Sequence, residues 1–131
     1  MNRPPAFQFY PKDWNDFKVQ RMSYEAQGIY MKILCFMWND SKDQCSMPND
    51  DFIIAKSLGI TIKRWMKIKE EIFYKNDPIF LTDGDKIISK RLRKEIKKIR
   101  IYRRIQSEKG KKSALSRGTM VEPRLNRRGN R

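Results

Sequence analysis

The residues of this sequence best suited to chemistry are its lysines and arginines. Residues 90–131 hold 17 Lys and Arg against 3 Asp and Glu, a net charge of +14, whereas residues 1–89 hold 13 against 12, a net charge of +1. Cationic side chains at this density attract polyanions and displace counterions condensed on a phosphate backbone. The charge distribution therefore predicts a nucleic-acid partner. An anionic membrane surface and a merely solvating tail are the alternatives.

The densest cations are expected to touch phosphate, which positions a protein on nucleic acid without specifying sequence. This pattern does not distinguish DNA from RNA. The expected contacts are Lys86, Lys90, Arg91, Arg93, Lys94, Lys97, Lys98, Arg100, Arg103 and Arg104.

A second cationic group lies in residues 61–67, where Thr61 is expected to cap a helix. The apolar residues of this helix face the core, so Lys63, Arg64 and Lys67 fall on its outward side. The N-terminal half of a recognition helix is the part that reaches base edges. Arg64 is the best candidate because a guanidinium can bind guanine through two hydrogen bonds. The alternative is that these charges only solvate a surface.

We expect no catalysis, no cofactor and no bound metal. The sequence has no histidine, so no imidazole can act as a base or a metal ligand. Its six glycines form no GxxxxGK phosphate loop. The acidic pairs Asp50-Asp51, Glu70-Glu71 and Asp83-Asp85 are explained as a helix cap, a solvated helix face and a turn.

Hydrophobic periodicity predicts three helices that position the second cationic group. Ser23 can cap a helix whose wide apolar face runs from Tyr24 to Trp38. After a polar loop, Asn49 or Asp50 can cap a helix over residues 52–58, and Gly59 can end it in the left-handed conformation. The helix after Thr61 should bury its apolar members, and together the last two helices form a helix-turn-helix. The side chains expected inward are Ile62, Trp65, Met66, Ile72 and Phe73.

Two short β-patterned runs, 79–81 and 86–89, flank a turn-forming segment at 82–85 and predict a hairpin. A helix-turn-helix followed by a hairpin is the winged-helix arrangement. The predicted fold is therefore α+β and mainly helical, with a winged-helix domain over residues 1–91. Residues 6–10 should form a short extended or strand-like segment before Pro11.

The apolar periodicity of residues 92–106 predicts a basic helix. Its apolar stripe should pack against the domain and consists of Leu92, Ile96, Ile99 and Tyr102. Residues 107–131 lack the apolar surface needed to offset the entropy of ordering, so we expect a disordered basic tail.

The remaining features indicate a cytoplasmic protein. The longest apolar run, residues 33–38, is too short to span a bilayer, and the N-terminus leads into no signal-peptide-like segment. The two cysteines make no disulfide framework. We expect Cys35 to be buried in its helix and Cys45 to lie in a polar loop.

Five segments carry a recognisable residue pattern: 5–14, which reads Pro-Ala-Phe-Gln-Phe-Tyr-Pro-Lys-Asp-Trp, and 22–30, 34–38, 55–60 and 88–92. The pattern resembles that of a phage- and prophage-associated winged-helix family of unknown function, over residues 4–95. Two departures are the polar, irregular segment at 40–46 and the end of the chain at residue 131, since family members often continue into a further region.

The resemblance implies a winged-helix domain like those at the front of phage replication-initiation proteins. It implies a role at a phage or prophage origin in a bacterial host cell, with double-stranded DNA and replication proteins such as a helicase or its loader as partners. It supplies no catalytic residues. Two other functions stay open, a phage transcriptional regulator and a protein-interaction adaptor, since a fold does not determine a function.

Overall fold

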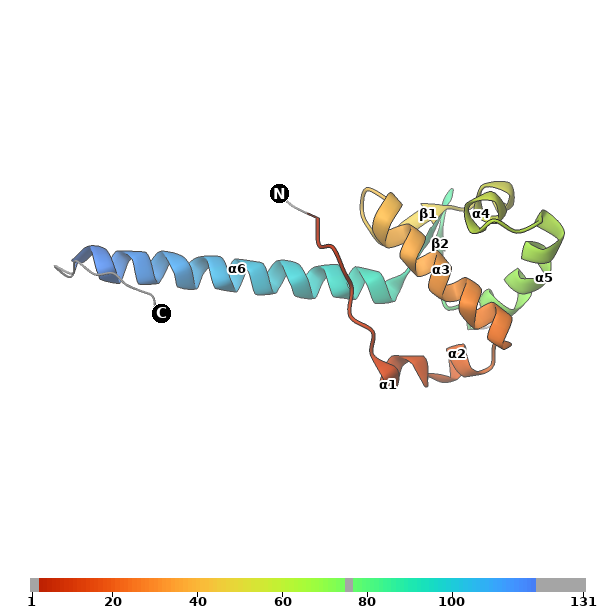
Figure 1. Cartoon of the computed structure of the whole chain (residues 1–131), viewed down its shortest axis with the longest axis horizontal. Helices are drawn as coiled ribbons and strands as arrows, with labels where there is room; N and C mark the ends of the chain where they lie inside the picture. The colour runs from red at the N-terminus through yellow and green to blue at the C-terminus, as the bar shows by residue number, and fades with distance from the viewer. Residues whose placement is uncertain (1–2, 75–76, 120–131) are drawn as a thin grey trace. The chain divides into compact units, whose positions relative to one another are not determined.

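The computed structural model describes the backbone of residues 3–74 and 77–119, and the side chains up to Lys112. The described chain forms two compact units, with the boundary between Lys97 and Lys98. It is mainly helical and carries one small three-stranded antiparallel sheet, so the fold class is α+β as predicted (Figure 1).

The N-terminal segment is extended through Tyr10 and then forms two one-turn helices, α1 (Pro11–Trp14) and α2 (Phe17–Gln20). Proline at the first helical position suits α1, because its missing N–H would have no intrahelical partner. The Asp16 side chain caps α2 by accepting from the Lys18 backbone N–H over 2.9 Å. Neither helix was predicted, since four residues are too few to display a helical period.

The central helix α3 (Tyr24–Asp40) begins where predicted, because Ser23 Oγ accepts from the Ala26 N–H over 3.2 Å. Its inner face buries Ile33, Leu34 and Met37 completely. The prediction that Cys35 is buried is wrong: it lies on the outer face of α3 and is exposed. An almost continuous apolar run does not reveal which of its members face the solvent.

Helices α4 (Asp51–Leu58) and α5 (Ile62–Ile72) follow, joined by a tight turn. Asp50 is the cap of α4, and its Oδ1 accepts from two backbone N–H groups. Gly59 adopts a φ of 72°, the left-handed conformation predicted for it. Thr61 Oγ1 caps α5 by accepting from the Arg64 N–H over 3.2 Å. The predicted caps of these two helices and the predicted end of α4 are therefore correct.

The inner face of α5 differs from the prediction at two positions, Met66 and Ile68. Trp65 and Ile72 are fully buried as expected, and so is Ile68, which the prediction omitted. Met66, predicted to face inward, is 43% exposed. Residues 65, 68 and 72 lie on one helical stripe, and Met66 is rotated about 100° from its neighbour Trp65, which removes it from that stripe.

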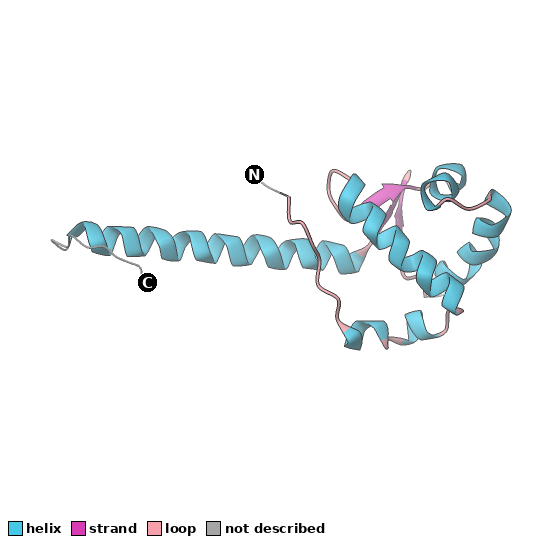
Figure 2. Ribbon diagram, in the orientation of Figure 1, coloured by secondary structure: helices cyan, strands magenta, loops and turns pink. Residues whose placement is uncertain are grey.

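The sheet has three strands, β1 (Ser46–Pro48), β2 (Leu81–Asp83) and β3 (Lys86–Ile88), in the order β1-β3-β2 (Figure 2). The predicted hairpin is present, with the turn narrowed to two residues and a φ of 61° at Gly84. The third strand was not predicted: β1 pairs antiparallel with β3. Cys45, immediately before β1, is buried, and its carbonyl accepts from the Ser89 N–H over 2.8 Å. Cys45 therefore lies in the loop before β1, as predicted, but it is buried rather than exposed.

Helix α6 (Lys90–Thr119) is longer than the predicted helix at both ends. Leu92 and Ile96 are buried, which confirms the first half of the predicted docking stripe, but Tyr102 at its far end is exposed. Residues 107–119, expected to be disordered, lie within α6, and residues 120–131 lie outside the described part of the chain. None of the described helices combines the length and the apolar character needed to cross a membrane.

Candidate nucleic-acid interface

The predicted recognition residues lie on one exposed sector of α5, which we call the α5 surface: Lys63, Arg64 and Lys67. All three are exposed, whereas Trp65 and Ile68 on the opposite side are buried. Lys67 follows Lys63 by four residues and Arg64 by three, so the side chains are neighbours on the helix. The structure therefore brings these cations together as predicted.

The electrostatics of α5 concentrate positive potential at its N-terminus. Its first turn contains no acidic residue but holds Lys63 and Arg64. A cation there opposes the helix dipole, whose positive end lies at the N-terminus. This placement costs stability but favours an anionic ligand such as phosphate. Thr61, also predicted to contact nucleic acid, is exposed, and its Oγ1 is occupied as the cap acceptor.

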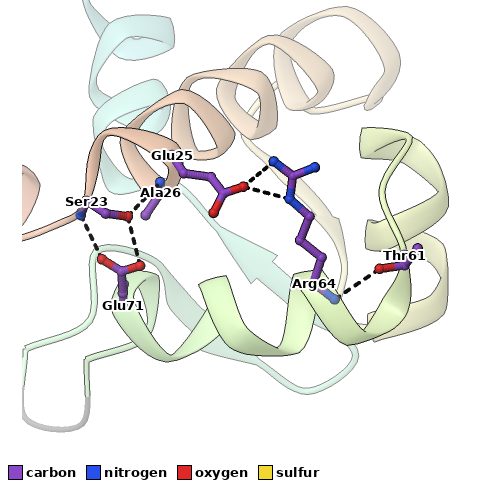
Figure 3. A network of polar contacts seen from close by, with 6 residues as sticks. All are labelled: Ser23, Glu25, Ala26, Thr61, Arg64 and Glu71. Atoms are coloured by element: carbon purple, nitrogen blue, oxygen red, sulfur yellow. Dashed lines mark hydrogen bonds and ion pairs between the residues drawn. The ribbon is translucent and has the colours of Figure 1, made fainter.

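Arg64 is held by Glu25 of α3, as Figure 3 shows. The carboxylate Oε2 accepts from Arg64 Nε over 2.6 Å and also from Arg64 Nη2. Both side chains keep contact with solvent, with 55% of Arg64 and 47% of Glu25 exposed. Ion pairs in such surroundings contribute about 0.2–1 kcal/mol to stability. Arg64 Nη1 has no hydrogen-bond partner among the described residues.

A second contact joins the other end of α5 to the start of α3. Glu71 accepts from the Ser23 N–H over 2.7 Å and from Ser23 Oγ over 2.9 Å (Figure 3). The prediction that Glu71 belongs to a solvated helix face is therefore wrong. The two contacts, Glu71 with Ser23 and Arg64 with Glu25, attach α5 to the first turn of α3.

Lys63 and Lys67 form no ion pair with any side chain that the structure describes. Both are exposed, so their ammonium groups face solvent. Among the described side chains, no carboxylate pairs with these two cations of the α5 surface, whereas Glu25 pairs with Arg64.

Lys86 lies on β3, exposed and opposite Asp83 in the hairpin register. Its charge also acts on Asp43. Burial alone would raise the pKa of Asp43, but hydrogen bonds from Ser41, Cys45 and Ser46, together with the positive charge of Lys86, lower that pKa to about 2. Neighbouring carboxylates therefore offset part of the charge that Lys86 could offer to a phosphate.

Arg91, another predicted phosphate contact, is used inside the first unit. Its Nη2 donates to the Gln8 carbonyl over 3.1 Å, and its guanidinium carbon lies 5.9 Å from the ring centroids of Phe7 and Phe9. One turn further along α6, the buried Glu95 accepts from the Gln8 N–H and from the Tyr10 hydroxyl. Arg91 and Glu95 thus attach the N-terminal segment to the start of α6.

The other cations of the first unit on α6 divide into two kinds. Arg93 interacts with the Cys45 thiol, although burial outweighs this interaction and raises the pKa of the thiol. Lys90, Lys94 and Lys97 are exposed at positions i, i+4 and i+7, and we call them the α6 stripe.

In the second unit, the predicted residues Lys98, Arg100 and Arg104 are exposed and Arg103 is half-buried.

The α5 surface and the α6 stripe belong to different helices of the first unit. In the view of Figure 1, the ribbon of α3 lies between α5 and the start of α6. The two groups of cations can therefore be replaced independently.

Sequence reasoning missed Glu25. A glutamate in the first turn of a helix is common, because the positive end of the helix dipole stabilises its negative charge. The type and position of Glu25 therefore gave no indication that it pairs with Arg64, 39 positions away. No protein-family model, curated protein or solved structure matches this chain.

Proposed function

We propose that this chain is a DNA-binding protein of the winged-helix class, without catalytic activity, that acts in the initiation of phage or prophage DNA replication. The order of elements supports the class. A helix (α3) and a strand (β1) precede a helix-turn-helix (α4 and α5), and a hairpin (β2 and β3) follows it, with β1 paired to β3. The same order is found in winged-helix domains.

The observation that carries DNA binding is the α5 surface, three exposed cations on the outward side of the second helix of a helix-turn-helix. An α-helix fits the major groove of B-DNA, and the N-terminal residues of such a helix meet base edges. The α6 stripe and the cations of the second unit would add phosphate contacts. Double-stranded DNA is therefore the proposed ligand.

The replication role rests on the sequence resemblance. That resemblance also suggests the cytoplasm of a bacterial host as the location and a helicase or its loader as a further partner. A transcriptional regulator would use the same α5 surface, so this surface supports both roles equally.

A protein-interaction adaptor is the second candidate, and the outer side of α4 favours it. Phe52 is 74% exposed and Ile53 is 43% exposed there. Exposed apolar side chains of this size are typical of protein contacts when they cluster. An adaptor would keep its partner at salt concentrations that remove DNA, because apolar contacts are not screened by ions.

The test compares two double variants with the same loss of charge. Lys63→Ala with Lys67→Ala alters the α5 surface, and Lys12→Ala with Lys42→Ala removes two exposed lysines elsewhere. Gel shifts with double-stranded DNA, single-stranded DNA and RNA over a salt series measure the affinities. We expect the wild type to prefer duplex DNA. The α5 variant should reduce the slope of log affinity against log salt by about 1 for each lost phosphate contact.

The control pair should leave the slope nearly unchanged. If both pairs weaken duplex binding equally, the α5 surface is not the interface. If the wild type retains a protein partner but no nucleic acid at physiological salt, the adaptor function replaces the proposed one.

A further inference from the structure

We propose that Glu25 orients Arg64 for reading a guanine base, so that α3, outside the helix-turn-helix, contributes to sequence recognition. This inference rests on the proposed DNA binding. It would make Glu25 a positioning residue, which acts on the ligand through Arg64.

Glu25 occupies the edge of the guanidinium that does not meet a base. Its Oε2 binds Nε and Nη2, which lie along the side of the group, and leaves Nη1 and the second hydrogen of Nη2 available. Guanine is read by two N–H donors that reach its O6 and N7 together. The free end of Arg64 offers such a pair of donors. Figure 3 shows the unbound nitrogen pointing away from Glu25.

The position of Arg64 in α5 fixes its backbone. It is the third residue of the helix, and its backbone N–H is held by the Thr61 cap. The backbone is therefore fixed, and the long side chain is the remaining source of freedom. Arginine has many rotamers, and binding must overcome the loss of that freedom unless another group has already ordered the side chain. The Glu25 carboxylate supplies that order.

Glu25 is itself held in position by further contacts. It lies in the first turn of α3, which Ser23 caps. Glu71 of α5 accepts hydrogen bonds from the backbone N–H and the hydroxyl of Ser23 (Figure 3). A group that orients a contact residue is effective when its own position is held by further contacts. Because α5 contacts the start of α3 at both Arg64 and Glu71, the carboxylate and the guanidinium keep their relative position.

A simpler role for Glu25 would be to compete with DNA for Arg64. A competing carboxylate would be most effective at the end of the guanidinium, across Nη1 and Nη2, because that end meets the base. Glu25 takes the Nε side instead. The observed geometry therefore favours orientation over competition.

The experiment is binding-site selection from randomised duplexes with full-length protein, followed by competition between the selected site and a scrambled duplex. The variants are Glu25→Gln, Glu25→Ala and Arg64→Ala. Glu70→Gln serves as the control, because Glu70 is exposed on α5 and a change to glutamine removes the same charge. Thermal melts establish that each variant is folded.

The wild type should select guanine at one position. Glu25→Ala should reduce the preference for guanine there by about tenfold, while affinity for scrambled duplex stays the same or rises slightly. Glu25→Gln should cause a smaller loss, and Glu70→Gln none. Arg64→Ala should abolish the same preference, and adding Glu25→Ala to it should cause no further loss, as expected for two residues that act as one unit.

Two results would overturn the inference while leaving DNA binding intact. One is a Glu25→Ala variant that binds both duplexes more tightly with its guanine preference unchanged, which would make Glu25 a competitor. The other is a wild type that binds duplex DNA without selecting guanine. A wild type that binds no duplex at all would overturn both this inference and the proposed function.

Discussion

The buried indole of Trp65 on α5 donates its Nε1 hydrogen to Asp51 Oδ1 on α4 over 2.9 Å. The same oxygen accepts from Lys69 Nζ over 2.9 Å. The hydrogen bond from Lys69, followed by the one from Trp65, holds the pKa of Asp51 below its usual value. One carboxylate therefore joins α4 to α5 and satisfies the polar atom of a buried tryptophan.

Replacing Trp65 should severely destabilise the first unit. Trp65→Ala removes a fully buried aromatic side chain and should lower the free energy of unfolding by about 3–5 kcal/mol. Met66→Ala, at the neighbouring exposed position, should change it far less. Thermal melts followed by circular dichroism give both values. A Trp65→Ala protein with a normal melting temperature would contradict the burial of this residue.

Replacing Glu95 should loosen the N-terminal segment. Glu95 is 6% exposed and accepts from the Gln8 N–H over 3.1 Å and the Tyr10 hydroxyl over 2.9 Å. Hydrogen bonds to a charged group contribute about 1.5–3 kcal/mol, so Glu95→Ala should lower stability by an amount of that order. Urea unfolding measures it, with Lys94→Ala on the exposed side of α6 as the control. Equal stability of the two variants would show that the segment is not held by Glu95.

Asp43 should make stability depend on pH below about 4. Its pKa in the folded protein is about 2, because the hydrogen bonds and the charge of Lys86 outweigh the effect of burial. Unfolded Asp titrates near 3.9. A depressed folded pKa contributes stability that is complete above the unfolded value and is lost as the pH falls towards the folded value.

Asp43→Asn removes that contribution. Urea unfolding should show the variant less stable than the wild type at pH 7, and the difference should shrink as the pH is lowered from about 4 to about 2. Comparing the two proteins at each pH cancels the titration of the other carboxyl groups. A difference that does not change with pH would mean that the ionised form of Asp43 is not what stabilises the loop.

Deletion after Lys97 should flatten the salt dependence of DNA binding. Residues 98–131 hold 12 Lys and Arg against 2 Asp and Glu, a net charge of +10, and counterion release scales with the phosphates neutralised. Cutting at this boundary keeps the buried Leu92 and Ile96, so the first unit retains its core. Filter binding at several salt concentrations measures the slope. An unchanged slope in a folded deletion variant would exclude these residues from the interface.

Much of the local structure could be predicted from the sequence alone. The cap residues Ser23, Asp50 and Thr61 and the left-handed Gly59 lie where the residue types predicted them. Each of these features depends on contacts between residues at most five positions apart. The outward position of Lys63, Arg64 and Lys67 followed for the same reason, since helical periodicity is a local property. The concentration of positive charge towards the C-terminus is a direct property of the sequence.

Tertiary structure decided the features that depend on distant partners. Strand β1 forms because residues about 40 positions further along the chain supply its hydrogen bonds, and a three-residue strand has no pattern of its own. Cys45, just before β1, is buried beside Ser89, a residue 44 positions later, whereas Cys35 on the outer face of α3 is exposed.

The candidate site depends on such distant partners most of all. Arg64 was predictable as an exposed cation, but its contact with Glu25 joins α5 to α3. Arg91 looked like one more phosphate contact, yet the fold places it against Gln8, 83 positions earlier in the chain. A charged side chain has the same intrinsic chemistry wherever it occurs in a sequence. Whether it meets solvent, a carboxylate or a backbone carbonyl depends on which segments the folded chain places beside it.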